Sequence, residues 1–315
     1  MKKPINVGII GYGSCGRLHA EAIQKLSSIF FLVAIADIDS VAAPEGARIY
    51  SDYRELLADP GVDAISICTY PNLHYEQTLA ALNSEIYRDV LVEKPPVLEV
   101  GQCRELGNLA LTRGVVLYFA HHTSMIPPVA AARQLLAGRE VVGIEALYMD
   151  NALGWHSPDK WIFKVSTAGG GVLMDCGINI MSAVMGVLPE ARFTPTRVKV
   201  SSAPSVDVET QAEVDFSFGT RGSGHLTMDW EYPKNIRRIR FTTSDGETVT
   251  IDIVRGRLYC DGRVAFGFEN SDNNLSMEYP LVYQDFADHI ARRESNTNTQ
   301  PLRFILDTYN KIKDR

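Results

Sequence analysis

The chain has 315 residues, and its 31 Lys and Arg against 38 Asp and Glu give a formal charge of −7. With 45% hydrophobic and 22% charged residues it has the composition of a globular protein of about two domains, which excludes disordered, collagen-like and coiled-coil chains. The acidity argues against nucleic-acid binding, no apolar run approaches the ~20 residues of a membrane span, and no signal peptide is visible. Five widely spaced cysteines without a C-x-x-C pair indicate neither disulfides nor a metal site, so we expect a reduced, cytoplasmic protein.

The first third of the chain alternates short apolar strands with helical segments. We expect strands at residues 5–10, 31–36, 63–68, 90–92 and 115–120. A helix should begin just after Asp52, whose side chain can cap the first turn while Glu55 reaches back. Strands separated by helices predict right-handed crossovers and a parallel, doubly wound sheet of the α/β class.

The first strand leads into a Gly-x-Gly-x-x-Gly loop and then a helix. Gly11 would permit the tight turn, Gly13 would let the backbone approach a pyrophosphate, and Gly16 would let the helix pack on the strand. Asp37 ends the second strand, 21 residues after Gly16, where it can bind the adenosine ribose and repel a 2′-phosphate. We therefore predict an NAD site and favour NAD over NADP; the alternative is a glycine-rich turn that serves packing alone.

Ligands of such sheets bind beyond the carboxyl ends of the strands, so the side chains at these ends should rim one crevice. The candidate cofactor contacts are Gly11, Tyr12, Gly13, Ser14, Cys15, Gly16, Asp37, Thr69, Asn72, His74, Glu93 and Lys94. Of the histidines, His19 and His74 are expected mainly to support the loops. His122 follows the last of these strands and is a candidate substrate contact.

The pattern changes after about residue 140. Residues 210–218 alternate apolar with polar side chains, as do shorter stretches up to residue 253, and Asp-Gly pairs mark two turns. This predicts antiparallel strands with one buried face, followed by helices at 281–292 and 302–313. We expect a Rossmann domain at residues 1–122 and an α+β domain with a large, open-faced, mainly antiparallel sheet at 123–315, whose last helix can pack back on the first domain.

The segment between the two halves is the most informative about a substrate. Its aromatic and acidic side chains are Asp150, Trp155, His156 and Trp161. Three glycines at 169–171 lead into an apolar helix that carries Asp175 and Asn179, four residues apart and therefore neighbours on successive turns. Such a pair could hold a polyol, and Gly177 between them would let a ligand or a strand come close.

Four motifs, in order along the whole chain, resemble the glucose-fructose oxidoreductase, inositol dehydrogenase and rhizopine-catabolism (Gfo/Idh/MocA) family. They are Gly-x-Gly-x-x-Gly-x-x-His at 11–19, Thr-x-Pro-Asn-x-His at 69–74, Glu-Lys-Pro at 93–95, and the glycine-rich helix with Asp175-x-Gly177. The resemblance implies a Rossmann domain followed by an open-faced sheet domain, often dimeric or tetrameric through the sheet. Most members carry His where this chain has Asn179.

Residues 93–96, 155–156, 161–162 and 175–179 are similar to a subgroup of the family, the bacterial D-galactose and L-arabinose 1-dehydrogenases. Members of the subgroup often use NADP, whereas Asp37 points back to NAD. The chain differs from the subgroup at His121-His122 and at Asp150. These differences affect the prediction of the sugar more than the prediction of the reaction. The resemblance implies oxidation of the anomeric C1 hydroxyl of a sugar to the lactone, with hydride transfer to nicotinamide.

That reaction needs a base and a group that stabilises negative charge. Asp175 is the first candidate for the base, because Asn179 cannot titrate near neutrality, and Lys94 is the second; as a cation, Lys94 would instead stabilise the oxyanion. The candidate substrate contacts are Lys94, His122, Asp150, Trp155, His156, Asp175 and Asn179. Each has a structural alternative, such as an ion pair of Lys94 with Glu93, a helix-terminal acid at Asp175, or hydrogen-bonded and core roles for the others.

Two other functions stay open. One is a dehydrogenase for another polyol or sugar derivative, such as an inositol or an amino sugar. The other is a non-catalytic NAD(H)-binding regulator on the same scaffold, which would have a protein partner. The main interpretation implies a small sugar or polyol as substrate, NAD as cofactor, no metal, and a homodimer or homotetramer formed through the second sheet.

Overall fold

A computed structural model of the chain describes residues 3–42, 44–267 and 275–313. The chain divides into two compact units, Met1–His121 with Leu275–Thr299, and His122–Asn274 with Gln300–Arg315. We predicted that all residues after 122 belong to one domain. In the structure, residues 275–299 group with the first unit, and the final helix groups with the second. This return of the chain leaves no mark in the local sequence pattern, because it depends on which surface a helix packs against.

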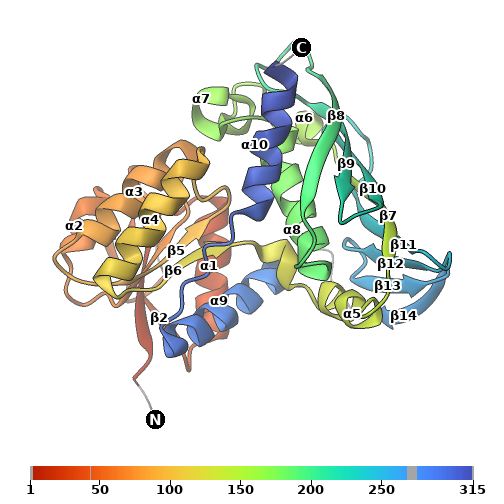
Figure 1. Cartoon of the computed structure of the whole chain (residues 1–315). Coiled ribbons are helices and arrows are strands. Elements are labelled where there is room, and N and C mark those ends of the chain that lie inside the picture. Colours follow the sequence, from red (N-terminus) through yellow and green to blue (C-terminus); the bar gives the residue numbers. More distant parts are fainter. Residues whose placement is uncertain (1–2, 43, 268–274, 314–315) are drawn as a thin grey trace. The chain divides into compact units, whose positions relative to one another are not determined.

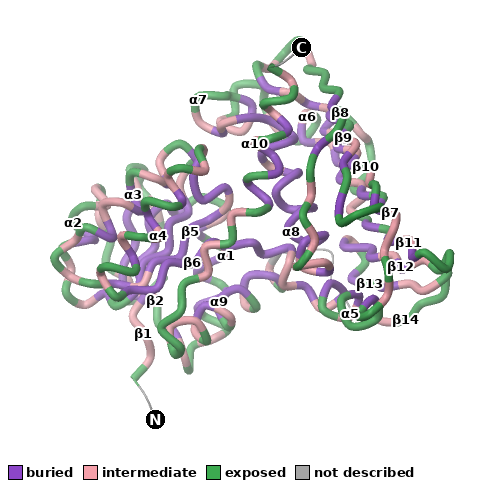
Figure 2. The backbone as a smooth tube through the Cα atoms, viewed as in Figure 1, coloured by how far each residue is buried: buried purple, intermediate pink, exposed green. Residues whose placement is uncertain are grey.

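The first unit is built on a parallel sheet of six strands, in the order β3-β2-β1-β4-β5-β6. The strands are β1 (Ile5–Ile10), β2 (Phe30–Ala36), β3 (Arg48–Tyr50), β4 (Ala64–Ile67), β5 (Asp89–Glu93) and β6 (Leu117–Ala120). The central strands are buried (Figure 2), as expected for a parallel sheet covered on both faces. The predicted α/β class is confirmed; β3, with three residues, is too short to give a pattern in the sequence.

The helices of the first unit are α1 (Ser14–Lys25), α2 (Tyr53–Ala58), α3 (Pro71–Asn83), α4 (Val100–Arg113) and α9 (Leu275–Arg292). α3 packs beside α4, and α1 beside α9 (Figure 1). The predicted cap of α2 is present, since Asp52 Oδ1 accepts a 2.8 Å hydrogen bond from the Arg54 amide. α9 begins before the predicted residue 281, and Pro280 lies inside it.

The second unit holds an eight-stranded sheet in the order β14-β13-β12-β11-β7-β10-β9-β8. The strands are β7 (Val141–Met149), β8 (Phe193–Ser201), β9 (Gln211–Phe218), β10 (Gly222–Asp229), β11 (Ile236–Thr243), β12 (Thr248–Asp252), β13 (Arg257–Cys260) and β14 (Arg263–Gly267). All neighbours are antiparallel except β7 and β10. The Asp261-Gly262 turn has positive φ at both residues, 46° and 76°, as a two-residue type I′ hairpin requires.

Helices cover one face of this sheet. They are α5 (Pro127–Leu135), α8 (Ile178–Val187) and α10 (Gln300–Lys313), with the short segments η1 (His122–Met125), α6 (Ala152–Trp155), η2 (Trp161–Phe163), α7 (Val165–Ala168) and η3 (Leu173–Gly177). The other face carries charged cross-strand pairs such as Lys199–Glu213 at 3.0 Å and Arg240–Glu145 at 3.3 Å. The predicted open-faced, mainly antiparallel sheet is confirmed.

One helical stretch, Val165–Val187, is long and apolar enough by length and composition to cross a membrane, with a mean hydropathy of 1.4. In the structure, 89% of its most apolar window is buried inside the fold. Burial on nearly all sides accounts for this composition, which is that of the central helix of a globular unit.

Candidate functional site

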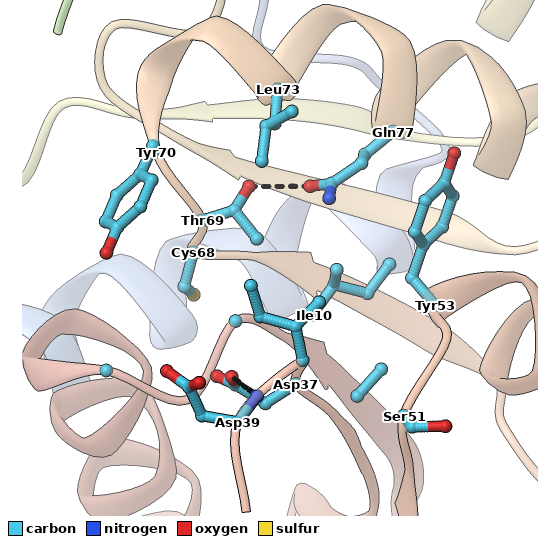
Figure 3. Close-up of a pocket in the computed structure, with 14 residues that line it drawn as sticks. Ile10, Asp37, Asp39, Ser51, Tyr53, Cys68, Thr69, Tyr70, Leu73 and Gln77 are labelled. Carbon is cyan, nitrogen blue, oxygen red and sulfur yellow. Dashed lines mark hydrogen bonds between the residues drawn. The ribbon is translucent and has the colours of Figure 1, made fainter. Parts of the chain in front are cut away.

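A pocket opens at the carboxyl ends of β1, β2 and β4 in the first unit. It is lined by Ile10, Gly11, Gly13, Ala36, Asp37, Ile38, Asp39, Ser51, Tyr53, Cys68, Thr69, Tyr70, Leu73 and Gln77. Figure 3 shows Thr69 and Gln77 across the pocket from Asp37 and Asp39. Glycine backbone, a pair of acids and apolar side chains from neighbouring strand ends are the surroundings that the adenosine half of a dinucleotide requires.

The three loop glycines are required for two different structural reasons. At Gly11, where φ is +88°, a Cβ atom would lie 2.8 Å from the Thr69 amide nitrogen, and at Gly16 a Cβ atom would lie 2.1 Å from the Gly11 carbonyl oxygen. Side chains at both positions are therefore excluded by backbone atoms. At Gly13 a Cβ atom would meet nothing within 4 Å, so that space is open at the N-terminus of α1. This is where a phosphate group would bind the free N–H groups of the helix.

Asp37 is held in place by backbone amides. Its Oδ2 accepts a 2.6 Å hydrogen bond from Tyr12 N, and its Oδ1 accepts one of 2.9 Å from Asp39 N. Each carboxylate oxygen has a second lone pair that can accept from a ribose hydroxyl. The pocket thus fits a dinucleotide whose ribose carries free hydroxyl groups.

Several predicted cofactor residues support the pocket without lining it. His74 Nδ1 lies 2.7 Å from the Pro95 carbonyl oxygen and its Nε2 lies 3.0 Å from that of Thr69. This buried histidine therefore joins the loops that follow β4 and β5, as the loop-supporting role expected of it requires. Glu93 is also buried; its Oε1 faces His19 Nε2 at 3.0 Å, and its Oε2 accepts from the backbone N–H of half-buried Lys94 at 3.2 Å.

The other predicted contacts, Tyr12, Ser14, Cys15, Gly16 and Asn72, lie in or beside the same loops, and their contact with a cofactor stays a prediction. Sequence reasoning missed most of the acidic and aromatic lining. Asp39, Ser51, Tyr53 and Gln77 lie outside the quoted binding motifs, and Tyr70 is a variable position of the motif at 69–74. The available signal was position alone, since each lies within a few residues of the carboxyl end of a strand or in the helix after it.

In the second unit, the triple glycine has a packing explanation. A Cβ atom at Gly171 would lie 2.0 Å from the Glu209 carbonyl oxygen, and one at Gly170 would lie 2.0 Å from the Tyr309 hydroxyl. Glu209 Oε1 accepts hydrogen bonds from the amides of Gly171 and Leu173 and from Tyr309. Glu209 thus satisfies amides at the start of the helix that carries the predicted catalytic acid.

That helix begins as one π-helical turn, η3, before it continues as α8. π-helical turns are rare and occur frequently at functional sites. Asp175 lies in this turn and is partly exposed, while Asn179 lies in α8 and is buried. Gly177 admits the close approach of protein neighbours: a Cβ atom there would meet Ile305 of α10 at 2.6 Å and Met228 of strand β10 at 3.3 Å. Contact of a ligand with Gly177 stays a prediction.

Asp150 provides the most distinctive electrostatic feature of the second unit. Its side chain follows β7, is buried, and has one oxygen, Oδ1, with no hydrogen-bond partner among the described residues. Burial raises the pKa of Asp150 to about 6; nearby Arg237 opposes this and the negative charge of Asp175 adds to it. Asp150 and Asp175 therefore share one electrostatic neighbourhood, and a buried carboxylate oxygen without a donor is costly until a ligand supplies one.

The remaining predicted substrate residues also fall in the second unit. Trp155 exposes 56% of its surface, which is unusual for a tryptophan. Burial and the charge of Lys160 lower the pKa of His156, so this ring is neutral at pH 7. The charge of Asp175 has the opposite, smaller effect on this pKa. His122 is buried in η1, which packs against α8. Lys94 belongs to the first unit, so the predicted site residues are divided between the two units.

Comparison with known proteins adds a second line of evidence. Residues 5–121 match the model of an oxidoreductase family with an NAD-binding Rossmann fold, Gfo/Idh/MocA. Galactose 1-dehydrogenase of Pseudomonas fluorescens is 29% identical over 98% of this chain and 95% of its own, and D-glucoside 3-dehydrogenase of Escherichia coli K12 is 31% identical over 74% and 72%. The crystal structure of D-galactose-1-dehydrogenase from Rhizobium etli superimposes with a TM-score of 0.85 at 28% identity, covering 98% of this chain and 96% of that one.

Proposed function

Since this chain belongs to the Gfo/Idh/MocA family of NAD-binding oxidoreductases, we propose that it is an NAD-dependent aldose 1-dehydrogenase. The substrate is a sugar of the D-galactose or L-arabinose type, whose C1 hydroxyl is oxidised to the lactone. The bound nicotinamide ring accepts the hydride from C1. The observation that carries the proposal is the buried oxygen of Asp150, which has no hydrogen-bond partner among the described residues and whose carboxyl group feels the charge of Asp175. It occurs in a chain similar over 98% of its length to a galactose 1-dehydrogenase.

The residues of the second unit supply substrate contacts in this proposal. Asp150 Oδ1 accepts a hydrogen bond from a sugar hydroxyl, which removes the cost of its unpaired state. His156, neutral at pH 7, donates to or accepts from a second hydroxyl. The exposed face of Trp155 covers the C–H surface of the ring, and buried His122 and Asn179 orient it.

Asp175 takes the proton of the C1 hydroxyl as base or as the first member of a relay. The substrate hydroxyl loses its proton to the carboxylate, and the C1 hydride leaves as the carbonyl forms. Lys94 remains a cation and stabilises the developing oxyanion.

Two substitutions test these roles by steady-state kinetics and by NADH binding. We expect Asp175→Asn to lower kcat by about 10²–10⁴-fold, the range for loss of a general base, with NADH affinity kept. Lys94→Ala should lower kcat as well. Asp207→Asn, which removes an exposed acid of the same unit, serves as the matched control and should change neither quantity. Near-normal kcat in Asp175→Asn together with loss of activity in Lys94→Ala would assign the base to Lys94.

The open face of the second sheet also supports an assembly. Its charged ladders, such as Lys199 with Glu213, fit a second copy that offers the same mixed charges. The protein forms a homodimer or homotetramer through this face, in the cytoplasm, where thiols are reduced unless an oxidant acts on them. Light scattering after size exclusion, with Arg240→Glu placing two acids opposite each other in place of the Arg240–Glu145 pair, tests the assembly; a wild-type monomer would contradict it.

A further inference from the structure

Beneath the dinucleotide pocket, two cysteines and a histidine form a compact cluster. The sulfur atoms of Cys15 and Cys68 and a ring nitrogen of His19 all lie within 4.8 Å of one another. Cys15 is the second residue of α1, in the first turn after the glycine loop, and Cys68 follows β4 and lines the pocket (Figure 3). No local pattern indicates a pair, because the two cysteines are 53 positions apart in the chain.

The surroundings of the cluster make the two thiols unequal. Cys15 Sγ lies 3.4 Å from the Tyr279 hydroxyl, and Cys68 Sγ lies 3.7 Å from Ser66 Oγ. The hydrogen bond with Cys68 lowers the pKa of Cys15 to about 6 against the effect of burial, and His19 assists. Burial raises the pKa of Cys68 well above its usual value. The two neighbouring thiols therefore differ in acidity, and Cys15 is the one that loses its proton more readily.

His19 is a buried cation-forming group within 4.8 Å of both sulfurs. Its Nε2 faces Glu93 Oε1 at 3.0 Å, and its Nδ1 lies 2.8 Å from Ser66 Oγ and 3.1 Å from the Tyr283 hydroxyl. Burial alone would lower the pKa of His19, but hydrogen bonds to Cys15 and Glu93 outweigh it and raise the pKa to about 9. A thiolate beside an imidazolium is the arrangement of reactive cysteines, and Cys68 supplies the adjacent thiol that resolves an oxidised sulfur.

We propose that Cys15 and Cys68 are a reversible oxidation site that forms a disulfide with hydrogen peroxide and thereby weakens dinucleotide binding. The Cys15 thiolate attacks one peroxide oxygen, the O–O bond breaks, and hydroxide leaves and takes up a proton to become water. The product, a sulfenic acid on Cys15, is then attacked by Cys68; the S–S bond forms, and the sulfenic hydroxyl leaves with the Cys68 proton as a second water. The two sulfurs together lose two electrons, which reduce one peroxide to two waters.

The structure connects this bond to cofactor binding. The sulfurs must approach from within 4.8 Å to about 2.05 Å, which draws the first turn of α1 toward the end of β4. Gly11 packs directly on the Cys68-Thr69 peptide, since a Cβ atom on it would meet the Cys68 carbonyl carbon at 2.9 Å. A shift of either partner therefore moves the glycine loop and the helix N-terminus to which a phosphate binds.

The test treats the full-length protein with hydrogen peroxide and measures disulfides by peptide mapping, free thiols by titration, and NADH affinity by fluorescence. We expect a single Cys15–Cys68 linkage, a loss of two of the five thiols, and NADH binding weakened about tenfold, all reversed by dithiothreitol. Cys68→Ser and, separately, Cys15→Ser should show the same NADH affinity before and after peroxide. Cys103→Ser, which removes a buried thiol of α4, should respond like the wild type.

Each readout can overturn the inference without reference to any sugar, so its failure is distinguishable from failure of the proposed activity. Five titratable thiols after peroxide would contradict it, as would a linkage between other cysteines. An affinity loss that persists in Cys68→Ser would also contradict it. If the purified protein instead holds one zinc ion per chain and releases the two thiols only to a chelator, the cluster is a metal site and the disulfide is excluded.

Discussion

The Tyr12 amide donates a 2.6 Å hydrogen bond to Oδ2 of Asp37, so the glycine loop after β1 and the end of β2 meet at the dinucleotide pocket. The second carboxylate oxygen is fixed by Asp39 N at 2.9 Å. Two amides therefore determine where the negative charge of Asp37 lies before any cofactor binds. This preorganisation makes Asp37 the residue that should determine the choice between NAD and NADP.

Substitution of Asp37 should change cofactor preference. We expect Asp37→Ser to lower the ratio of kcat/KM for NAD over that for NADP by at least about tenfold, which is ~1.4 kcal/mol, because the ribose loses an acceptor and a 2′-phosphate loses a repelling charge. Asp37→Asn, which keeps the size and removes the charge, separates the two causes. A wild-type protein that already prefers NADP would contradict this role of Asp37.

The loop glycines should separate folding from binding. Gly16→Ala places a Cβ atom 2.1 Å from the Gly11 carbonyl oxygen, so we expect the free energy of unfolding to fall by roughly 1–3 kcal/mol. Gly13→Ala meets nothing within 4 Å, so its unfolding free energy should stay within ~1 kcal/mol of the wild type while NADH affinity falls about tenfold or more. Urea unfolding and NADH titration measure both. Equal stability losses in the two variants would show that packing alone explains the loop.

Stability should depend on pH through Asp150. Its pKa is about 6 in the fold and ~3.9 in the unfolded chain, so the folded state binds the proton more tightly. The resulting destabilisation is absent below about pH 4, grows between about pH 4 and 6, and is complete above that window. We therefore expect Asp150→Asn to raise the free energy of unfolding by roughly 2–3 kcal/mol near pH 8 and to have little effect near pH 4.

Urea unfolding across this pH range measures the difference between the variant and the wild type. Asp207→Asn is again the matched control, because that carboxylate is exposed and should give no difference at any pH. A constant difference for Asp150→Asn from acid to alkaline pH would mean that Asp150 is not the group responsible.

Much of the first unit follows from local sequence pattern. The strand at residues 5–10, the glycine loop and Asp37 lie within one short βαβ segment, where apolar periodicity and turn chemistry determine the structure. The return of α9 to pack beside α1 is different, because it is a contact between residues more than 250 positions apart. The parallel pairing of β7 with β10 is non-local in the same way.

The residues of the candidate site also fall into those that depend on near neighbours and those that depend on distant parts of the chain. The glycines and Asp37 could be predicted because their roles depend on near neighbours. The unpaired oxygen of Asp150 and the Cys15–Cys68 cluster could not, because burial and side-chain partners are set by elements brought together only in the fold. Glu209, which accepts hydrogen bonds at the start of η3 from more than thirty residues away, was missed for the same reason.

The most direct test of the central claim is nicotinamide reduction by the wild-type protein, followed by absorbance, with D-galactose, L-arabinose, D-fucose, D-xylose, D-glucose and myo-inositol, each with NAD and with NADP. We expect reduction of NAD with D-galactose or L-arabinose, and weaker reduction of NADP with the same sugar. Tight NADH binding without turnover of any of these compounds would contradict the assignment as an aldose 1-dehydrogenase.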